Sequence, residues 1–217
     1  MSEHIFWEDS WNAFDPERVV PYADHLEKSP DPAAAILAAR KPAAVCDAGC
    51  GCGAYTLKLA RLGYAVSGFD VSAKAVEITR QVLSAAGFPS GGFHPADIAL
   101  SGFADRQFDA VVSRDVIDHL PRASGPAAVS ELLRITRPGG CVILTLDPSD
   151  DEYESAPHTV NADGDYVFNA GKWNGMVFHP YSPEEIRSLA PGIPMETFAS
   201  GDGETIVVFE KPAEQPG

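Results

Sequence analysis

Three glycines at alternate positions follow an acid in the run Val45-Cys46-Asp47-Ala48-Gly49-Cys50-Gly51-Cys52-Gly53. The run begins as a short apolar strand, and its glycines reach the positive φ angles of a tight turn at little steric cost. Because glycine has no Cβ, the backbone can also come unusually close to a bound molecule. The run therefore predicts a ligand site directly after a strand.

The residues after the turn predict a helix over 54–62, because Tyr55, Leu59 and Leu62 fall in one apolar stripe. A strand, a glycine turn and a helix form the opening of a doubly wound α/β domain. In such domains, ligands bind at the carboxyl ends of the strands. The fold class and the place of the site follow before the ligand is known.

Two classes of ligand compete for this geometry. A dinucleotide favours the pattern G-x-G-x-x-G, with its pyrophosphate on the helix N-terminus, but Thr56 stands where the third glycine should be. The charge of Asp47 would oppose a pyrophosphate, whereas it would attract an ammonium or sulfonium group. The turn thus favours a cationic amino-acid ligand, and a nicotinamide-dependent oxidoreductase is the less favoured alternative.

Over about residues 43–145 the chain resembles the class I S-adenosylmethionine-dependent methyltransferases, whose first motif is an acid-x-Gly-x-Gly-x-Gly turn. Asp70 closes the next strand, predicted over 65–69, near the spacing at which a carboxylate meets ribose hydroxyls. Asp97 follows a predicted third strand over 92–95. Residues 108–113 are similar to the family's fourth strand, and residues 137–140 to the turn before its fifth. Five matches in the family's order make the resemblance specific.

The resemblance implies S-adenosylmethionine as the cofactor, S-adenosylhomocysteine as its product and a small molecule as the methyl acceptor. In the family, the acid at the position of Asp97 faces the adenine amino group, and the segment 116–120 borders both the methionine moiety and the acceptor. The residues expected at the cofactor are Asp47, Gly49, Cys50, Gly51, Gly53, Asp70, Val71, Asp97, Ile98, Arg114 and His119.

Methyl transfer in this family is an in-line displacement, in which the protein mainly supplies alignment of the reacting atoms. A general base is needed only for an acceptor that arrives protonated. His119 is the leading candidate for it, because imidazole titrates near neutrality, and a purely positioning role is the alternative. His179 and Tyr181 are further candidates for catalysis. A module that binds the cofactor without catalysis is a competing interpretation.

The composition limits the acceptor. The chain has 217 residues, which predicts a single domain over 1–217, and its formal net charge is -15. This charge repels a phosphate backbone, and no cluster of lysine or arginine appears along the sequence, so we expect no nucleic-acid substrate. The segment after residue 113 also lacks the Asn/Asp-Pro-Pro-aromatic element of enzymes that methylate base amino groups. A neutral or cationic small molecule is the expected acceptor, with oxygen, nitrogen, sulfur and carbon all open.

Three cysteines in the glycine turn raise the question of a metal site. A closed zinc site usually pairs a C-x₂₋₄-C motif with a second pair elsewhere, and the only other cysteine is Cys141 inside an apolar strand, so we expect no metal. The first residues contain acids and no apolar core of signal-peptide length, and no segment is long enough for a membrane span. We expect a cytoplasmic protein, monomeric or homodimeric, in which Trp7 and Trp11 form a lid or a subunit contact.

The predicted architecture is a Rossmann-like sheet of about seven strands with an antiparallel last strand. Asp-Pro pairs at 15–16 and 31–32 predict two helices in an N-terminal cover over 1–41, ahead of a cofactor-binding core over 42–147. An aromatic-rich insertion over 148–182 predicts a two-stranded ribbon or lid, with strands at 166–168 and 176–178. A capping box predicts a helix from Ser182, and a hairpin completes the segment 183–212.

Overall fold

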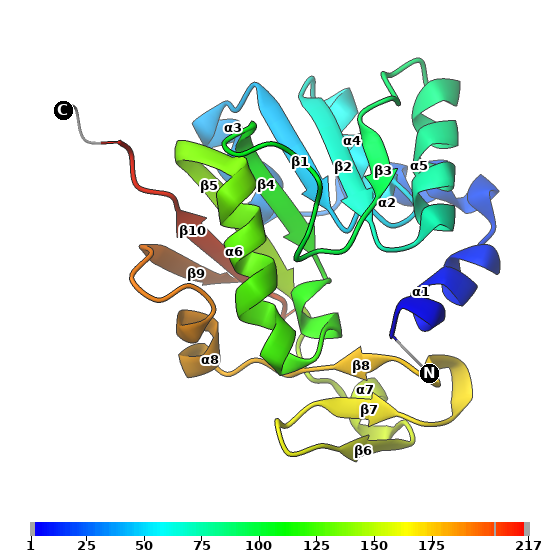
Figure 1. The fold of residues 1–217 in the computed structure, drawn as a ribbon. Coiled ribbons are helices and arrows are strands. Elements are labelled where there is room, and N and C mark those ends of the chain that lie inside the picture. The colour runs from blue at the N-terminus through cyan, green and yellow to red at the C-terminus, as the bar shows by residue number, and fades with distance from the viewer. Residues whose placement is uncertain (1–2, 202, 215–217) are drawn as a thin grey trace.

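A computed structural model describes residues 3–201 and 203–214 of the chain. Seven strands form one sheet in the order β3-β2-β1-β4-β5-β10-β9, and three short strands form a second sheet, β6-β7-β8, below it in Figure 1. The strands of the large sheet are β1 (Ala44–Ala48), β2 (Ala65–Asp70), β3 (Phe93–Pro95), β4 (Phe108–Arg114), β5 (Thr136–Leu146), β9 (Met195–Ala199) and β10 (Thr205–Glu210). Those of the small sheet are β6 (His158–Val160), β7 (Tyr166–Phe168) and β8 (Val177–Phe178).

The strand order reverses direction between β1 and β4. β1 pairs in parallel with both β2 and β4, and β10 pairs antiparallel with both β5 and β9. Because a crevice opens where neighbouring connections leave in opposite directions, the carboxyl ends of β1 and β4 are the expected place for a ligand. The expected Rossmann-like sheet of seven strands, with its antiparallel last strand, is confirmed.

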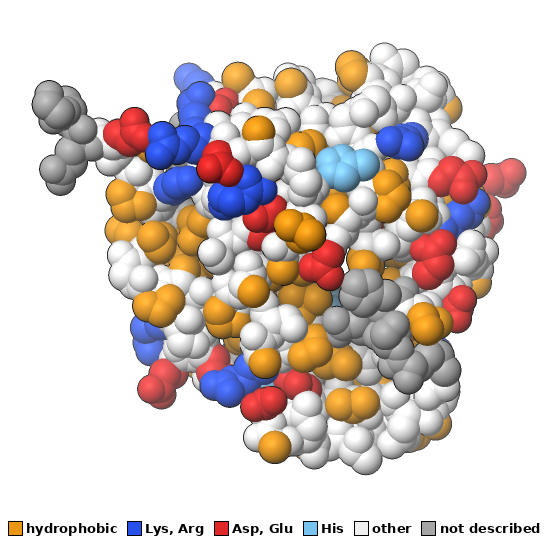
Figure 2. Space-filling view, in the orientation of Figure 1, with side chains coloured by type: hydrophobic (Ala, Val, Ile, Leu, Met, Phe, Trp, Pro, Cys, Tyr) orange, Lys and Arg blue, Asp and Glu red, His pale blue; other side chains and the backbone are white. Residues whose placement is uncertain are grey.

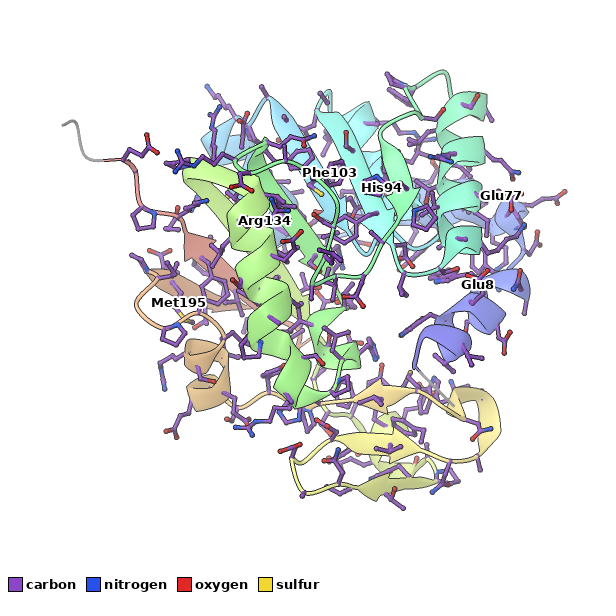
Figure 3. All side chains as sticks on the ribbon, in the orientation of Figure 1. Glu8, Glu77, His94, Phe103, Arg134 and Met195 are labelled. Atoms are coloured by element: carbon purple, nitrogen blue, oxygen red, sulfur yellow. The ribbon has the colours of Figure 1, made fainter. Side chains whose placement is uncertain are left out.

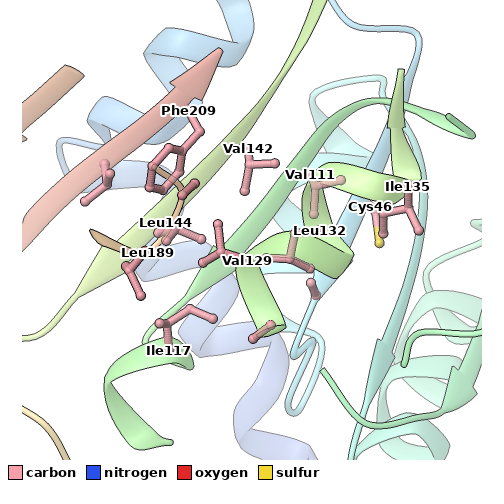
Figure 4. Close-up of a cluster of buried hydrophobic side chains, with 14 of the residues drawn as sticks. Cys46, Val111, Ile117, Val129, Leu132, Ile135, Val142, Leu144, Leu189 and Phe209 are labelled. Atoms are coloured by element: carbon pink, nitrogen blue, oxygen red, sulfur yellow. The ribbon is translucent and has the colours of Figure 1, made fainter. Parts of the chain in front are cut away.

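Helices cover both faces of the large sheet, and one further short helix, α7, lies in the insertion. They are α1 (Glu3–Asn12), α2 (Val19–Lys28), α3 (Pro32–Arg40), α4 (Ala54–Arg61), α5 (Ala73–Ala85), α6 (Gly125–Ile135), α7 (Asp151–Ser155) and α8 (Pro183–Ser188). Side chains of α6 pack on one face against Val111, Val142 and Leu144, as Figure 4 shows, while α3 and α4 pack on the other against residues one position along each strand. This alternation explains why β4 and β5 are nearly continuous apolar runs.

Short polar side chains start several helices at the expected places. Asp31 accepts a hydrogen bond from the Ala34 N–H at 2.9 Å, and Ser72 accepts one from the Ala75 N–H at 3.1 Å. Ser182 forms the capping box expected for α8. Each cap satisfies a backbone donor that the first turn of a helix leaves without a partner. The helices at 32 and 182 are confirmed, whereas α1 and α7 were not predicted.

The insertion differs from the expected two-stranded ribbon. It contains α7 and a third strand, β6, which pairs antiparallel with β7. Its aromatic side chains pack mainly on one another: the ring centroids of Tyr153 and Phe178 lie 4.3 Å apart, and those of His158 and Tyr166 also 4.3 Å apart. A shared apolar interior of this kind gives the small sheet its own core.

The sequence contains no basic cluster, but folding gathers four basic residues. Figure 2 shows Lys and Arg side chains grouped on one face near the C-terminal end. Carboxylates or backbone carbonyls engage all four of them: Arg134 with Glu131 and Asp105, Arg137 with Asp109, Arg106 with Glu214, and Lys211 with the Leu133 and Thr136 carbonyls. The neighbouring acids leave little net positive potential for a polyanion.

The packing of Gly53, at the start of α4, can be tested against Gly87 as a control. Both glycines have the same backbone angle, φ +80°. A Cβ at Gly53 would lie 2.9 Å from the Cα of Thr79, whereas nothing lies within 4 Å at Gly87. Alanine costs backbone strain at both positions but meets α5 only at Gly53. We expect Gly53→Ala to lower the free energy of unfolding by about 1–3 kcal/mol more than Gly87→Ala in urea titrations. Equal losses of unfolding free energy in the two variants would show that α5 can move away from a Cβ at Gly53 without an energetic penalty.

Candidate active site

One cavity of about 560 Å³ lies at the carboxyl ends of β1, β2 and β4. Ten of the eleven residues expected at the cofactor line it, and Gly53 does not. The lining residues are Trp7, Trp11, Tyr22, Leu26, Asp47, Gly49, Cys50, Gly51, Cys52, Tyr55, Phe69, Asp70, Val71, Ala96, Asp97, Ile98, Ala99, Arg114, Asp115, Val116, His119, Leu120, Ala123, Ser124 and Ala127. A cavity of this size can hold a ligand as large as a nucleoside with an amino-acid tail.

The three glycines of the turn have different tasks. Gly49 and Gly51 have φ +81° and +51°; a Cβ at Gly49 would collide with Val116, and one at Gly51 would lie 3.0 Å from the Trp11 ring. Both therefore bring bare backbone to the cavity wall. Gly53 instead admits the close approach of Thr79 on α5. Gly53 thus packs on α5 outside the residues that line the cavity, and its contact with the cofactor stays a prediction.

Asp47 is a buried carboxylate beneath the turn. One oxygen accepts the Thr56 hydroxyl at 2.5 Å, which explains why threonine stands where a dinucleotide site would have glycine. Burial raises the pKa of Asp47 to about 6, and the hydrogen bond with Thr56 and the charge of Arg114 oppose this rise. The carboxylate is therefore charged near neutrality, in a place where a cation would stabilise it further.

Asp70 holds the other side of the turn. Its two oxygens accept backbone hydrogen bonds from Gly51 and Ser72, both at 2.9 Å. Burial raises the pKa of Asp70 to about 6 as well, against the lowering effect of these two bonds. Because a carboxylate oxygen can accept two hydrogen bonds, each oxygen keeps a site for a ligand hydroxyl.

The far end of the cavity is formed by Val71, Asp97 and Ile98. Asp97 is exposed, and one of its oxygens accepts the Ala99 N–H at 2.8 Å. Val71 and Ile98 are half-buried apolar side chains that follow β2 and β3. Apolar side chains with a carboxylate at the rim suit a flat heterocycle that carries an amino group.

Arg114 ends β4 between carboxylates. Its guanidinium lies 3.5 Å from Glu204 and 3.9 Å from Asp31, and its central carbon lies 4.7 Å above the centre of the Tyr55 ring. The side chain is only 19% exposed, so these contacts hold it at one place in the cavity wall. It is the cation nearest to the buried Asp47 among the lining residues, and it can face an anionic group of a ligand.

His119 lies in a short turn after β4, in contact with the insertion. Its Nδ1 is 3.3 Å from the Val177 carbonyl oxygen of β8, and its Nε2 is 3.9 Å from an Asp147 oxygen. Burial lowers the pKa of His119, while Asp147 and the Val177 carbonyl act in the opposite direction. The imidazole is therefore mostly neutral near pH 7 and lines the cavity as a proton acceptor.

His179 and Tyr181 lie outside the residues that line the cavity. The His179 ring is buried between Asp165, at 3.0 Å from Nδ1, and Glu185, at 3.5 Å from Nε2, and it contacts the Tyr181 ring edge-on. The backbone N–H of His179 donates to the Asp118 carbonyl at 2.7 Å. This geometry gives no support for a catalytic role of either residue. Both lie where the insertion joins the large domain.

The N-terminal helices cover the opening of the cavity. Trp7 and Trp11 of α1 and Tyr22 and Leu26 of α2 form part of its lining. Glu8 of α1 accepts the Ser72 hydroxyl at 2.5 Å, where α1 meets α5 (Figure 3). The lid and the subunit contact both stay predictions for the two tryptophans. Their helix was missed because its apolar residues do not follow a clear period.

The thiols are poor metal ligands in this arrangement. All four cysteines are free and buried, and burial raises the pKa of each. Among the described residues, two groups of acidic or imidazole side chains come within 4.8 Å of one another: Asp118, His119 and Asp147, and Asp115, Asp147 and Glu204. Such acidic groups are common in the absence of a metal.

The sequence is similar to known methyltransferases over its central part. Residues 45–140 match the family described as "Methyltransferase domain". The magnesium-protoporphyrin O-methyltransferase of Synechocystis sp. is 36% identical over 92 residues, which are 41% of this chain and 38% of that protein. The ubiquinone biosynthesis O-methyltransferase of Paracidovorax citrulli is 30% identical over 103 residues, 46% and 42% of the two chains. The matched part thus spans less than half the length of these relatives.

Solved structures share the fold at low identity. A protein from Pyrococcus horikoshii OT3 has a TM-score of 0.69 at 19% identity, over 82% of this chain and 86% of that one. The magnesium protoporphyrin IX methyltransferase from Synechocystis PCC 6803, with bound S-adenosylmethionine, has a TM-score of 0.63 at 19% identity, over 97% and 98%.

The sheet order, the glycine turn and the succession of acids are similar to those of the class I S-adenosylmethionine-dependent methyltransferases, and the family match covers residues 45–140 of the chain. No helix among the described residues has the length and apolar character needed to cross a membrane.

The raised pKa values of the cavity acids predict a dependence of stability on pH. For Asp47 the pKa rises from 3.8 to about 6 on folding, so its contribution is fully present below about pH 4 and is lost as the pH rises through 6. The difference in unfolding free energy between the unliganded wild type and Asp47→Asn should therefore fall by about 2–3 kcal/mol over this range. Urea titrations at several pH values measure it, with Asp163→Asn as an exposed control. A difference that does not change with pH would contradict the assignment.

Proposed function

We propose that this chain transfers a methyl group from S-adenosylmethionine to a small-molecule acceptor. The observation that carries the proposal is the pair of buried carboxylates, Asp47 and Asp70, held on the two sides of one bare glycine turn inside one cavity. A cationic amino-acid end and a pair of ribose hydroxyls are what this pair can recognise together. A diphosphate would meet two negative charges instead.

The cavity offers a partner for each part of the cofactor. Asp47 would attract the ammonium and sulfonium charges, and Arg114 would face the carboxylate of the methionine end. The oxygens of Asp70 would accept from the ribose hydroxyls. Val71 and Ile98 would contact the adenine, with Asp97 at its amino group. The cofactor, when bound, supplies a methyl group already activated by the positive charge on sulfur.

The residues of the chain then align and deprotonate the acceptor. Trp7 and Trp11 cover the cavity and exclude water. For an acceptor hydroxyl, His119 Nε2 takes the proton as the oxygen–carbon bond forms and the carbon–sulfur bond breaks, which leaves S-adenosylhomocysteine. The proton passes from His119 to solvent after the product leaves.

The acceptor that fits best is a neutral or cationic small molecule. Asp115, Asp147 and Glu204 lie close together beside the cavity and disfavour an anionic acceptor, in agreement with the net charge of -15. The relatives are named for O-methylation of magnesium-protoporphyrin and for ubiquinone biosynthesis, which favours an oxygen nucleophile on a ring system. Four free thiols favour a reducing compartment, so we propose the cytoplasm and a monomer or homodimer.

Asp70→Asn tests whether Asp70 binds the ribose of S-adenosylmethionine. The substitution keeps the shape of the side chain but turns one acceptor into a donor, which removes hydrogen bonds to the ribose worth about 0.5–1.5 kcal/mol each. We expect the Kd for S-adenosylmethionine in calorimetry to rise roughly 10-fold. Glu77→Gln, on the exposed face of α5, serves as the control and should leave the Kd unchanged. Binding of NAD in preference to S-adenosylmethionine by the wild type would overturn the proposal.

His119→Ala tests the chemistry. Loss of a general base typically lowers the rate 10²–10⁴-fold, so we expect a fall in kcat of about 100-fold or more with a much smaller change in cofactor affinity. Formation of S-adenosylhomocysteine with hydroxylated ring compounds measures it. Unchanged turnover would rule out the proposed role of His119 as the general base. No turnover by the wild type with any acceptor would favour the competing interpretation, a module that only binds the cofactor.

A further inference from the structure

The inserted sheet selects the tautomer of His119. A carbonyl oxygen can only accept a hydrogen bond, and the Val177 oxygen, 3.3 Å from Nδ1, lies closer to the ring than the Asp147 oxygen, 3.9 Å from Nε2, so it favours the proton of a neutral imidazole on Nδ1. The lone pair is then on Nε2. His119 is also one of the residues that line the cavity. The contact comes from β8, which lies outside the part of the chain that matches the methyltransferase family.

The carboxylate of Asp147 faces the other ring nitrogen, Nε2. The Asp147 oxygen Oδ2 lies 3.9 Å from His119 Nε2, and the same oxygen accepts the Tyr153 hydroxyl at 3.2 Å. The backbone N–H of Asp147 donates to Asp118 at 2.8 Å, which fixes the position of this residue at the end of β5. Three segments, from β5, α7 and β8, thus converge on one imidazole.

Aromatic rings enclose the group. The centroid of the His119 ring lies 5.3 Å from Trp7, 5.8 Å from Phe178 and 6.3 Å from Tyr153. Tyr153 in turn stacks on Phe178 at 4.3 Å. Rings on these sides limit rotation of the buried imidazole, whereas the Asp147 side chain stays 28% exposed.

We propose that Asp147 and Tyr153 are positioning residues for His119, and that the insertion exists to prepare this base. The proposal rests on the proposed methyl transfer and narrows its acceptor to a group that must lose a proton, such as a hydroxyl. The O–H bond breaks, its proton goes to Nε2, the oxygen takes the methyl carbon, and sulfur keeps the electron pair of the broken bond. Asp147 stabilises the imidazolium so formed, and the hydrogen bond from the Tyr153 hydroxyl favours the anionic form of Asp147, against the burial that raises the pKa of this carboxyl.

The first test needs neither cofactor nor acceptor. The ¹⁵N shifts of His119 should show a protonated Nδ1, and its pKa should fall by about 1–3 units in Asp147→Asn, because the facing carboxylate is lost. Tyr153→Phe should lower the pKa less, in the same direction. Tyr166→Phe, an aromatic change in the same insertion, is the control. The other groups that face His119 are Asp115 and Asp118, and both are unchanged in these variants.

The second test uses turnover. The wild-type kcat should rise with pH through the pKa of His119; in Asp147→Asn this limb moves to lower pH, and the plateau falls roughly 10-fold or more because the base is weaker. The Kd for S-adenosylmethionine should stay within about twofold. An Nε2–H tautomer, or an unchanged pKa in Asp147→Asn, would overturn the inference while leaving methyl transfer intact. Failure of the wild type to bind S-adenosylmethionine would overturn the proposed function instead.

Discussion

The structure depends on the burial of negative charge beneath a turn that has no side chains of its own. Asp47 and Asp70 come from neighbouring parallel strands, and their carboxylates are held by Thr56 and by two backbone N–H groups. Burial keeps both pKa values near 6, so the site holds charge that is only partly compensated. In the proposed function, a cationic ligand with hydroxyl groups would complete this compensation.

The insertion and the N-terminal helices complete the site from opposite sides. α1 brings two indole rings to the cavity, and β8 brings one carbonyl oxygen to the imidazole of His119. The insertion is joined to the large domain through His179, whose two ring nitrogens face carboxylates on separate segments. In the proposed reaction, binding of the cofactor and preparation of the acceptor would thus belong to different parts of one chain.

Much of the core was predictable because each signal is local. The glycine turn, the Ser72 cap and the acids that end strands are fixed by neighbours in sequence, and they place ten of the eleven expected residues on one cavity. The packing of Gly53 on Thr79 could not be predicted, because Thr79 is distant in sequence. His179, Asp147 and Tyr153 could not be placed, since their surroundings depend on how the insertion packs. The irregular apolar pattern of α1 concealed its helix.

The contact between Glu8 and Ser72 has a consequence for how a ligand enters. Glu8 of α1 accepts the Ser72 hydroxyl at the start of α5, and Trp11 lies against Gly51 in the turn. A ligand that passes between α1 and the turn would have to displace this helix. The rates of binding and release would then depend on how firmly α1 is held on α5.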